Sequence, residues 1–359
     1  MGFDEKIDRS GVTSSCTDLL KFQAMFHRHF AGGPVAAFGP KGEDTVLKGL
    51  NSYGRYRADL IKDKIKKKKA KLTARTLIEQ WDMADMHMLS ETGSGRIEGS
   101  ERTATVTIHD SPDWSRWREY DNGVALARLY YAGVLPGIAR GLGVKVAFDA
   151  KALDLKRPWS MTWTVPGAQE KNHGPIHSKL FDRTKESIEV ARRTSMNNGA
   201  LYYFCADEET KVFDMQGEAA LREQVRALAI ERASRQKKAH TAAGWELNVK
   251  TLMDHWDGQL ISIWKFKKGL LNEGTWHQDC TECPYASAWQ GLGKRALDLG
   301  YLYDYELHPT YYRHYHPDMV VQFEAIKTRG DSMCKFRVSQ PGRQKNSDPA
   351  FKGYTGKDV

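Results

Sequence analysis

Cys283 has the sequence context of a reactive thiol, because proline follows it directly. Proline is favoured at the first position of a helix, where its missing N–H would have no intrahelical partner. Cys283-Pro284 therefore predicts a helix capped by the cysteine. Free backbone N–H groups and the positive end of the helix dipole stabilise a thiolate at such a position, as a nucleophile requires. The alternative interpretation is a small apolar side chain that closes the start of a helix.

Cys280 lies three residues before Cys283, a spacing that also occurs in zinc sites and in redox-active pairs. A structural zinc site needs four ligands at recognisable spacing, and only Cys334 and scattered histidines could complete one. A thioredoxin-type pair would lack its βαβ context. We predict no metal and no cofactor, although metal binding by Cys280 and Cys283 stays open at this stage.

A second group of candidates lies on one predicted helix. One face of this helix carries four of the candidates at helical spacing: Tyr301, Asp304, Tyr305 and His308. An acid and an imidazole four residues apart can act together as general acid and base, and the tyrosines could orient a substrate. The alternative is an i,i+4 pair on a solvent-exposed face. The interleaved aromatic residues favour a site.

Two further features complete the candidate site. Arg313 or Arg329 could hold a substrate carboxylate through a bidentate pair, with residues 309–317 as a loop at the mouth of a pocket. Gly330-Asp331 predicts a turn into a strand whose alternate residues, beginning with Cys334, face the core. On this pattern alone, Cys334 is a packing residue.

An internal repeat places all of these residues in the second half of the chain. Residues 76–82 (TLIEQWD) recur as residues 251–257 (TLMDHWD), and Phe38 matches Phe213 at the same separation of 175 residues. Further matches follow in order, which indicates a duplication. We expect a degenerate N-terminal repeat at 20–166, a linker at 167–194, a C-terminal repeat with the active site at 195–341, and a polar tail at 342–359.

Each copy has the same predicted order of elements. A long charged helix comes first, at 43–70 and at 217–240. Strand-like alternation follows at 103–108 and 260–266, and shorter helices begin at Pro112 and Pro284. A further helix covers about 297–308 in the second copy. Two strands close each copy. They lie at 144–150 and 160–165 in the first copy and at 320–327 and 335–339 in the second copy. Helices with an antiparallel hairpin predict an α+β fold, with long helices packed on a small antiparallel sheet in each copy.

Composition narrows the class of protein. The net charge of +9 suggests nucleic-acid binding, but residues 62–71 alone hold seven lysines and one aspartate. Without a recognition motif, this run indicates a solvated helix end. Five cysteines are too few for a disulfide framework, and no apolar run reaches the roughly 20 residues that span a bilayer. We expect a cytoplasmic monomer or homodimer with a small-molecule substrate and no nucleic-acid or membrane partner.

The second copy resembles the L-2-amino-thiazoline-4-carboxylic acid hydrolase family over about residues 200–340. Two motifs carry the resemblance. The first is C-P-Y-A-x-A-W, which begins at Cys283 and is followed by G-L-G. The second is G-D-x-x-C-x-F, which begins at Gly330, and the segment Gly300–Asp304 between the two motifs also resembles the family. This resemblance implies a hydrolase that opens a five-membered C–N heterocycle next to a carboxylate. The resemblance implies that functional positions of the family correspond to Cys283, Asp304 and Cys334 in this sequence. Tyrosines stand before Asp304 where the family tends to have cysteine, which suggests a larger and more aromatic substrate.

The first copy lacks these motifs, because Ser111 stands at the position of Cys283 and no G-D-x-x-C-x-F follows. We therefore expect one working site, with Cys283, Asp304 and His308 catalytic and with Tyr301, Tyr305, Arg313 and Cys334 binding substrate. The expected reaction is hydrolysis of a C–N bond in a small cyclic amidine or amide that bears a carboxylate. The alternatives are a lyase or decarboxylase acting on an aromatic carboxylic acid, and a non-catalytic small-molecule-binding domain akin to 4-vinyl-reductase domains.

Overall fold

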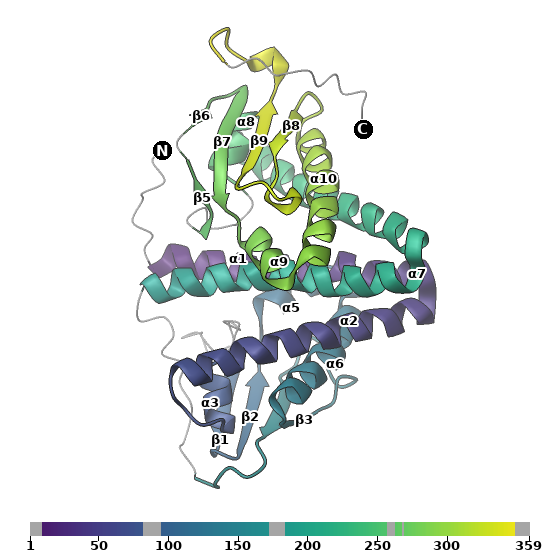
Figure 1. The fold of residues 1–359 in the computed structure, drawn as a ribbon, viewed down its shortest axis with the longest axis vertical. Helices are drawn as coiled ribbons and strands as arrows, with labels where there is room; N and C mark the ends of the chain where they lie inside the picture. The colour runs from purple at the N-terminus through teal and green to yellow at the C-terminus, as the bar shows by residue number, and fades with distance from the viewer. Residues whose placement is uncertain (1–8, 82–94, 172–183, 257–262, 268, 349–359) are drawn as a thin grey trace. The chain divides into compact units, whose positions relative to one another are not determined.

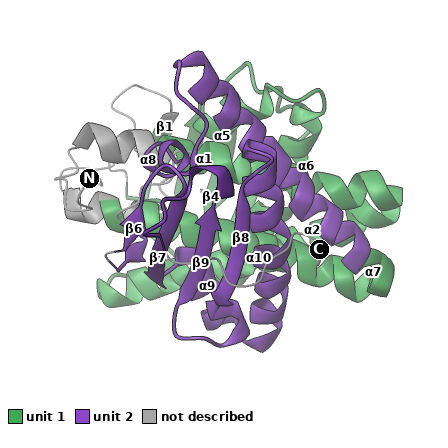
Figure 2. Cartoon of the chain, turned by 90° about the horizontal axis from the view of Figure 1, so that it is seen from above, with its two compact units in different colours: residues 1–217 green, residues 218–359 purple. Residues whose placement is uncertain are grey.

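Two compact units make up the chain, residues 1–217 and residues 218–359 (Figure 2). The computed structural model describes residues 9–81, 95–171, 184–256, 263–267 and 269–348 (Figure 1). Part of the strand predicted at 260–266 lies outside the described residues. Each unit combines long helices with a small antiparallel sheet, so the predicted α+β class is confirmed.

The first unit builds its sheet in the order β1-β2-β4-β3, with every neighbouring pair antiparallel. Side chains of β2 alternate between half-buried and buried, as the sequence pattern predicted. The strands are β1 (Gly95–Gly99), β2 (Thr103–Ile108), β3 (Lys145–Phe148) and β4 (Trp159–Thr164). The helices are α1 (Arg9–Phe30), α2 (Gly32–Lys67), α3 (Ala74–Glu79), α5 (Pro112–Trp117), α6 (Gly123–Leu142) and the first part of α7 (Thr184–Ala242).

Glycine allows α2 and α6 to pack with their backbones in close approach. A Cβ atom on Gly54 of α2 would lie 2.3 Å from the carbonyl oxygen of Val134 on α6, and one on Gly137 would lie 2.3 Å from the carbonyl oxygen of Asn51. No side chain fits at either position without a shift of backbone. This packing is one of the constraints that hold the first unit together.

The second unit repeats the arrangement with the strand order β5-β7-β9-β8 and with β6 paired to β7. All its strand pairs are antiparallel. The strands are β5 (Lys265–Phe266), β6 (Leu270–Leu271), β7 (Thr275–Glu282), β8 (Val320–Ala325) and β9 (Cys334–Ser339). The helices are the second part of α7, α8 (Val249–Asp254), α9 (Pro284–Leu292) and α10 (Lys294–Tyr315), and the short 3-10 helix η2 (Lys327–Arg329) follows β8.

Helix α10 is longer than the sequence suggested. The segment 309–317, predicted to be a loop, is helical as far as Tyr315, with Pro309 inside the helix. Its last turns bury Tyr311, Tyr312 and Tyr315, each at most 3 % exposed. Burial of three aromatic rings outweighs the roughly 3 kcal/mol that proline costs in a helix interior.

A non-helical residue interrupts α2 and α7 at positions separated by the period of the sequence repeat. Gly39 has φ 57° and ψ −136°, and Asp214 has φ 47° and ψ −125°. The residues just before them, Phe38 and Phe213, stack on each other with ring centroids 3.7 Å apart and planes 9° apart. The residues matched in the sequence therefore meet within the first unit.

The two compact units divide between Gly217 and Glu218, so the first part of α7 belongs to the first unit. The reason is that the first part of α7 packs with α1 and α2. Tyr202 contacts Phe30 edge to face, and Asn198 donates a hydrogen bond to the carbonyl of Leu19 at 3.2 Å.

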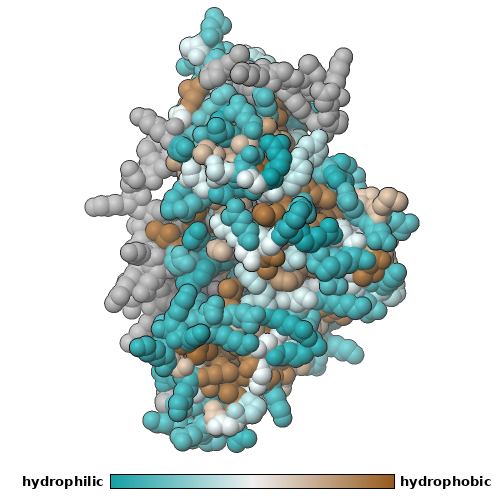
Figure 3. All heavy atoms as spheres, in the orientation of Figure 1, coloured by the Kyte–Doolittle hydropathy of each residue, from teal (hydrophilic) through white to brown (hydrophobic). Residues whose placement is uncertain are grey.

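None of the described helices has both the length and the apolar character that a membrane crossing requires. The face drawn in Figure 3 is mostly hydrophilic, with smaller hydrophobic patches between the polar side chains.

Replacement of Gly54 by alanine tests the packing of α2 on α6. We expect Gly54→Ala to lower the free energy of unfolding by about 1–3 kcal/mol, because the new Cβ overlaps the carbonyl of Val134. Gly291→Ala in α9 is the control, since nothing lies within 4 Å of its Cβ position, and it should stabilise by up to about 1 kcal/mol. Urea unfolding followed by circular dichroism measures both. Equal effects of the two substitutions would contradict the packing argument.

Candidate active site

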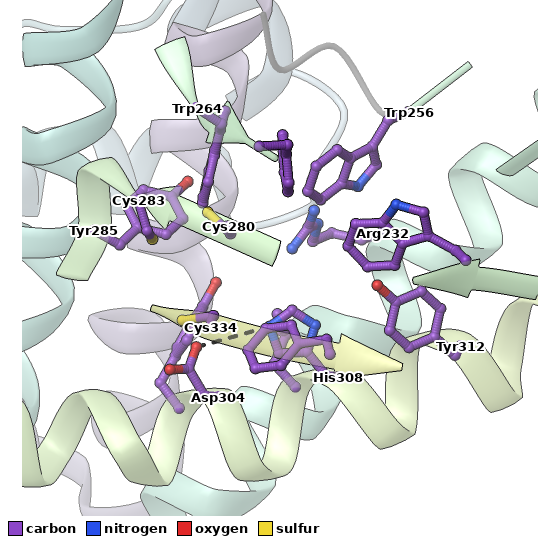
Figure 4. Close-up of a pocket in the computed structure, with 15 residues that line it drawn as sticks. Arg232, Trp256, Trp264, Cys280, Cys283, Tyr285, Asp304, His308, Tyr312 and Cys334 are labelled. Atoms are coloured by element: carbon purple, nitrogen blue, oxygen red, sulfur yellow. Dashed lines mark ion pairs between the residues drawn. The ribbon is translucent and has the colours of Figure 1, made fainter. Parts of the chain in front are cut away.

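The second unit contains a pocket that encloses about 600 Å³ of empty space, including the part open to solvent (Figure 4). Fifteen described residues line it, and eight of them are tryptophan, tyrosine or phenylalanine. Its chemistry-bearing side chains are Arg232, Cys280, Cys283, Asp304, His308 and Cys334. An aromatic pocket with six convergent functional groups is the natural candidate site of this unit.

Cys283 is placed by the direct passage from β7 into α9. It is the N-cap of α9, Pro284 takes the first helical position, and the Cys283 Sγ accepts a hydrogen bond from the Ala286 N–H at 3.4 Å. The predicted cap is therefore confirmed. The expected stabilisation of the thiolate is not found. Burial raises the pKa of the Cys283 thiol well above its ordinary value, and the neighbouring Cys280 adds to this effect. Desolvation outweighs the helix terminus, so the resting group is a thiol.

Two more thiols lie beside Cys283. Cys280 and Cys334 are directly opposite each other in the register of β7 and β9, and both are buried. Burial also raises the pKa of Cys280, and it raises that of Cys334 to about 12. Cys334 faces the core as predicted, and it also lines the pocket. Within the described parts of the chain, no group of three or more histidine, cysteine or acidic side chains is arranged to hold a metal ion.

Asp304 and His308 form a pair on α10. The Asp304 Oδ1 lies 3.7 Å from the His308 Nε2, so the predicted proximity of these residues is confirmed. The hydroxyl of Thr328, in η2, donates a hydrogen bond of 2.9 Å to the other oxygen, Oδ2. The imidazole packs on Phe336, with ring centroids 4.3 Å apart. Thr328 and Phe336 thus hold the two members of the pair from opposite ends.

The remaining predicted residues lie outside this pocket. Tyr301 and Tyr305 pack on each other, with centroids 6.0 Å apart, and Tyr305 is 36 % exposed. Neither tyrosine lines the pocket, and Tyr305 also packs against Phe323, with ring centroids 6.3 Å apart. Arg313 is exposed on α10, and Arg329 is exposed beside Asp331 at 3.3 Å. These arginines do not line the pocket.

The pocket contains an arginine that the sequence analysis missed. Arg232 comes from the second part of α7, and it is only 4 % exposed. Three tryptophans also line the pocket: Trp256, Trp264 and Trp276. A signal for Arg232 was present, because Arg57 precedes it by 175 residues in the repeated helix and is 2 % exposed. The spacing of the two arginines is a property of the sequence, but their burial is known only from the fold.

The fold and the pocket define an α+β protein with an aromatic cavity lined by three thiols. Residues 193–338 match the model of the L-2-amino-thiazoline-4-carboxylic acid hydrolase family, so the C-terminal part of the chain is similar to that family. The resemblance predicted for about residues 200–340 is confirmed. No curated protein and no solved structure matches the chain.

The first unit has different residues at the corresponding places in its sheet. Ile108 faces Trp159 at the end of the β2–β4 pairing, as Cys280 faces Cys334 at the end of the β7–β9 pairing. Ser111 is the N-cap of α5, and its hydroxyl hydrogen-bonds to the buried Asp113. None of the three thiols has a sulfur counterpart there.

The alkylation rate of Cys283 tests its protonation state. We expect modification by iodoacetamide to rise about tenfold per pH unit and to show no plateau up to pH 9, because only the thiolate reacts and the pKa is raised. Peptide mass spectrometry at a series of pH values measures the rate at each cysteine, with Cys283→Ser as the control for peptide assignment. A plateau below pH 7 would show that the helix terminus outweighs burial.

Asp113 makes the stability of the first unit depend on pH. Burial raises its pKa from 3.8 to about 6, so the folded state keeps a proton that the unfolded chain releases above pH 4. The free energy of unfolding should therefore fall by about 3 kcal/mol as pH rises from 4 to 6, and then stay level. Asp113→Asn should remove this decrease relative to wild type in urea titrations. Parallel pH profiles of the two proteins would refute the assignment.

Proposed function

We propose that the second unit is a hydrolase that opens a C–N bond of a small cyclic amidine or amide bearing a carboxylate. The observation that carries the proposal is the meeting of the Cys283 thiol, the Asp304–His308 pair and an aromatic cavity in one pocket. The match of the same residues to the hydrolase family supports the reaction class.

The proposed chemistry starts from a protonated thiol. The Asp304–His308 pair takes the proton of Cys283 as Sγ attacks the ring carbon that is bonded to nitrogen. The C–N bond then breaks, and the leaving nitrogen receives a proton from the same pair. Water adds to the carbon held on sulfur, the C–S bond breaks, and the thiol is restored. The sum is the addition of one water across the C–N bond.

Thr328 and the sheet support the proposed acid–base pair. The Thr328 hydroxyl occupies Oδ2 of Asp304, and the Oδ1 atom is the one nearest His308. The ring of His308 is restrained by Phe336 from β9. A pair restrained in this way is oriented before substrate arrives, which reduces the entropy lost in reaching the transition state.

We propose further that the chain is a tandem duplication in which only the second copy kept its site. The strand orders β1-β2-β4-β3 and β5-β7-β9-β8, the equivalent kinks at Gly39 and Asp214, and the stacked Phe38 and Phe213 support this. The first copy, proposed at 20–166, then has a structural role. The second copy, at 195–341, carries the chemistry.

A lyase or decarboxylase acting on an aromatic carboxylic acid is the second candidate. The raised pKa values of all three pocket thiols favour it, because such a reaction needs acid–base groups but no thiolate. It predicts that Cys283→Ser keeps most of the activity, whereas the hydrolase requires the thiol.

The deciding experiment incubates a pool of heterocyclic and aromatic carboxylic acids with wild type, Cys283→Ser and Ser111→Ala, and follows the pool by mass spectrometry. We expect a product heavier by one water with wild type and Ser111→Ala, and at least a hundredfold less with Cys283→Ser, the order of loss expected for a missing nucleophile. A product lighter by carbon dioxide that survives Cys283→Ser would establish the lyase. Retention of a compound without turnover would indicate a binding domain.

A further inference from the structure

Arg232 carries the permanent positive charge of the pocket. Among the described lining residues no other side chain is a guanidinium or an ammonium group. Its guanidinium carbon lies 5.0 Å from the centre of the Tyr311 ring, and Figure 4 shows the group entering the pocket near Trp256. Arg232 also interacts with the protein itself, but five N–H donors can serve more than one acceptor. A cation 4 % exposed among aromatic rings is costly to bury and strengthens any anion contact made there.

The walls of the pocket around Arg232 are aromatic. Trp256 and Trp264 lie with ring centroids 5.9 Å apart and planes 40° apart, and Tyr285 meets Trp264 edge to face at 5.6 Å. These rings pack on one another, and the surfaces that they present to the pocket can make stacking or edge contacts with a planar ring. A saturated ring fills the same volume without these contacts.

The first unit offers a natural comparison. Arg57 is equally buried, its guanidinium carbon lies 5.3 Å from the Trp81 ring, and its Nη1 donates a hydrogen bond of 3.2 Å to the Tyr130 hydroxyl. No thiol accompanies it, because Ile108, Ser111 and Trp159 stand where the second unit has cysteines. Arg57 thus shares the burial and the aromatic setting of Arg232 but not the chemical groups of the pocket.

We infer that Arg232 binds the carboxylate of the substrate as a bidentate pair, and that this carboxylate is attached to a planar, conjugated ring system. This inference rests on the proposed function in one respect, because the proposed reaction requires the scissile bond of the bound substrate to point toward Cys283. It replaces Arg313 and Arg329 as the anion-binding residue. It also assigns the substrate class through the shape of the aromatic walls.

The test measures binding rather than turnover, by isothermal titration calorimetry with probes of known structure. We expect 1-naphthoate to bind wild type about tenfold or more tightly than 1-naphthamide, which has the same rings without the charge. Decahydro-1-naphthoate, with the charge but without the flat rings, should also bind at least about tenfold more weakly. Equal affinities of wild type for the acid and its amide would overturn the carboxylate assignment. Equal affinities for the flat and saturated acids would overturn the substrate class.

Two variants then locate the site. Arg232→Gln should lose the preference for 1-naphthoate over 1-naphthamide, and Arg57→Gln should keep it within about twofold. A general loss of folding in Arg232→Gln would weaken the binding of both probes alike, and thermal unfolding would detect it. In that case the affinities of wild type and Arg232→Lys for 1-naphthoate and 1-naphthamide decide whether Arg232 binds the carboxylate. Retention of the full preference in Arg232→Gln, or its loss in Arg57→Gln, would overturn the inference. If the preference follows Arg232 but the substrate pool shows no hydrolysis, the anion site stands and the proposed hydrolase fails.

Discussion

The antiparallel pairing of β7 with β9 is the constraint on which the pocket depends. Its register places Cys280 opposite Cys334, and β7 then runs into α9 through Cys283, which brings three thiols to one end of the sheet. The segment between β8 and β9 carries Thr328 to Asp304, so the same hairpin that supplies a thiol also holds the carboxylate. A slip of one residue in this register would turn every side chain of β9 to the opposite face.

Burial decides the electrostatics of the site. The aromatic walls that shape the pocket also remove water from the thiols, and this desolvation raises their pKa values against the effect of the helix terminus at Cys283. Thiols in such surroundings react only when a base takes the proton, which makes Asp304 and His308 central to the proposed reaction. Arg232 on the α7 side and Asp304 on α10 then give the pocket charges of opposite sign, and these can orient a polar ligand between apolar walls.

The two units share an order of strands but differ in the residues at one end of their sheets. Both have a buried arginine on the long helix, a tryptophan after the short helix and the same order of strands. At the end of the β2–β4 pairing the first unit has Ile108 facing Trp159, whereas the second unit has Cys280 facing Cys334 at the end of the β7–β9 pairing.

The strand β7 was not predicted from the sequence. The sequence by itself determined the class of fold, the strands β8 and β9, the cap at Cys283 and the closeness of Asp304 and His308. These depend on local signals: proline at a helix start, alternation in strands, and the 100° turn of a helix per residue. The tertiary structure alone decided that Arg232 rather than Arg313 lies in the pocket, that Tyr305 does not line it, and that α10 continues through Pro309. Each of these depends on which neighbours cover a side chain, and burial by residues distant in sequence overrides local preference. The raised pKa of Cys283 has the same origin, because the number of atoms that exclude water from a thiol is a property of the folded pocket and not of the residues beside it.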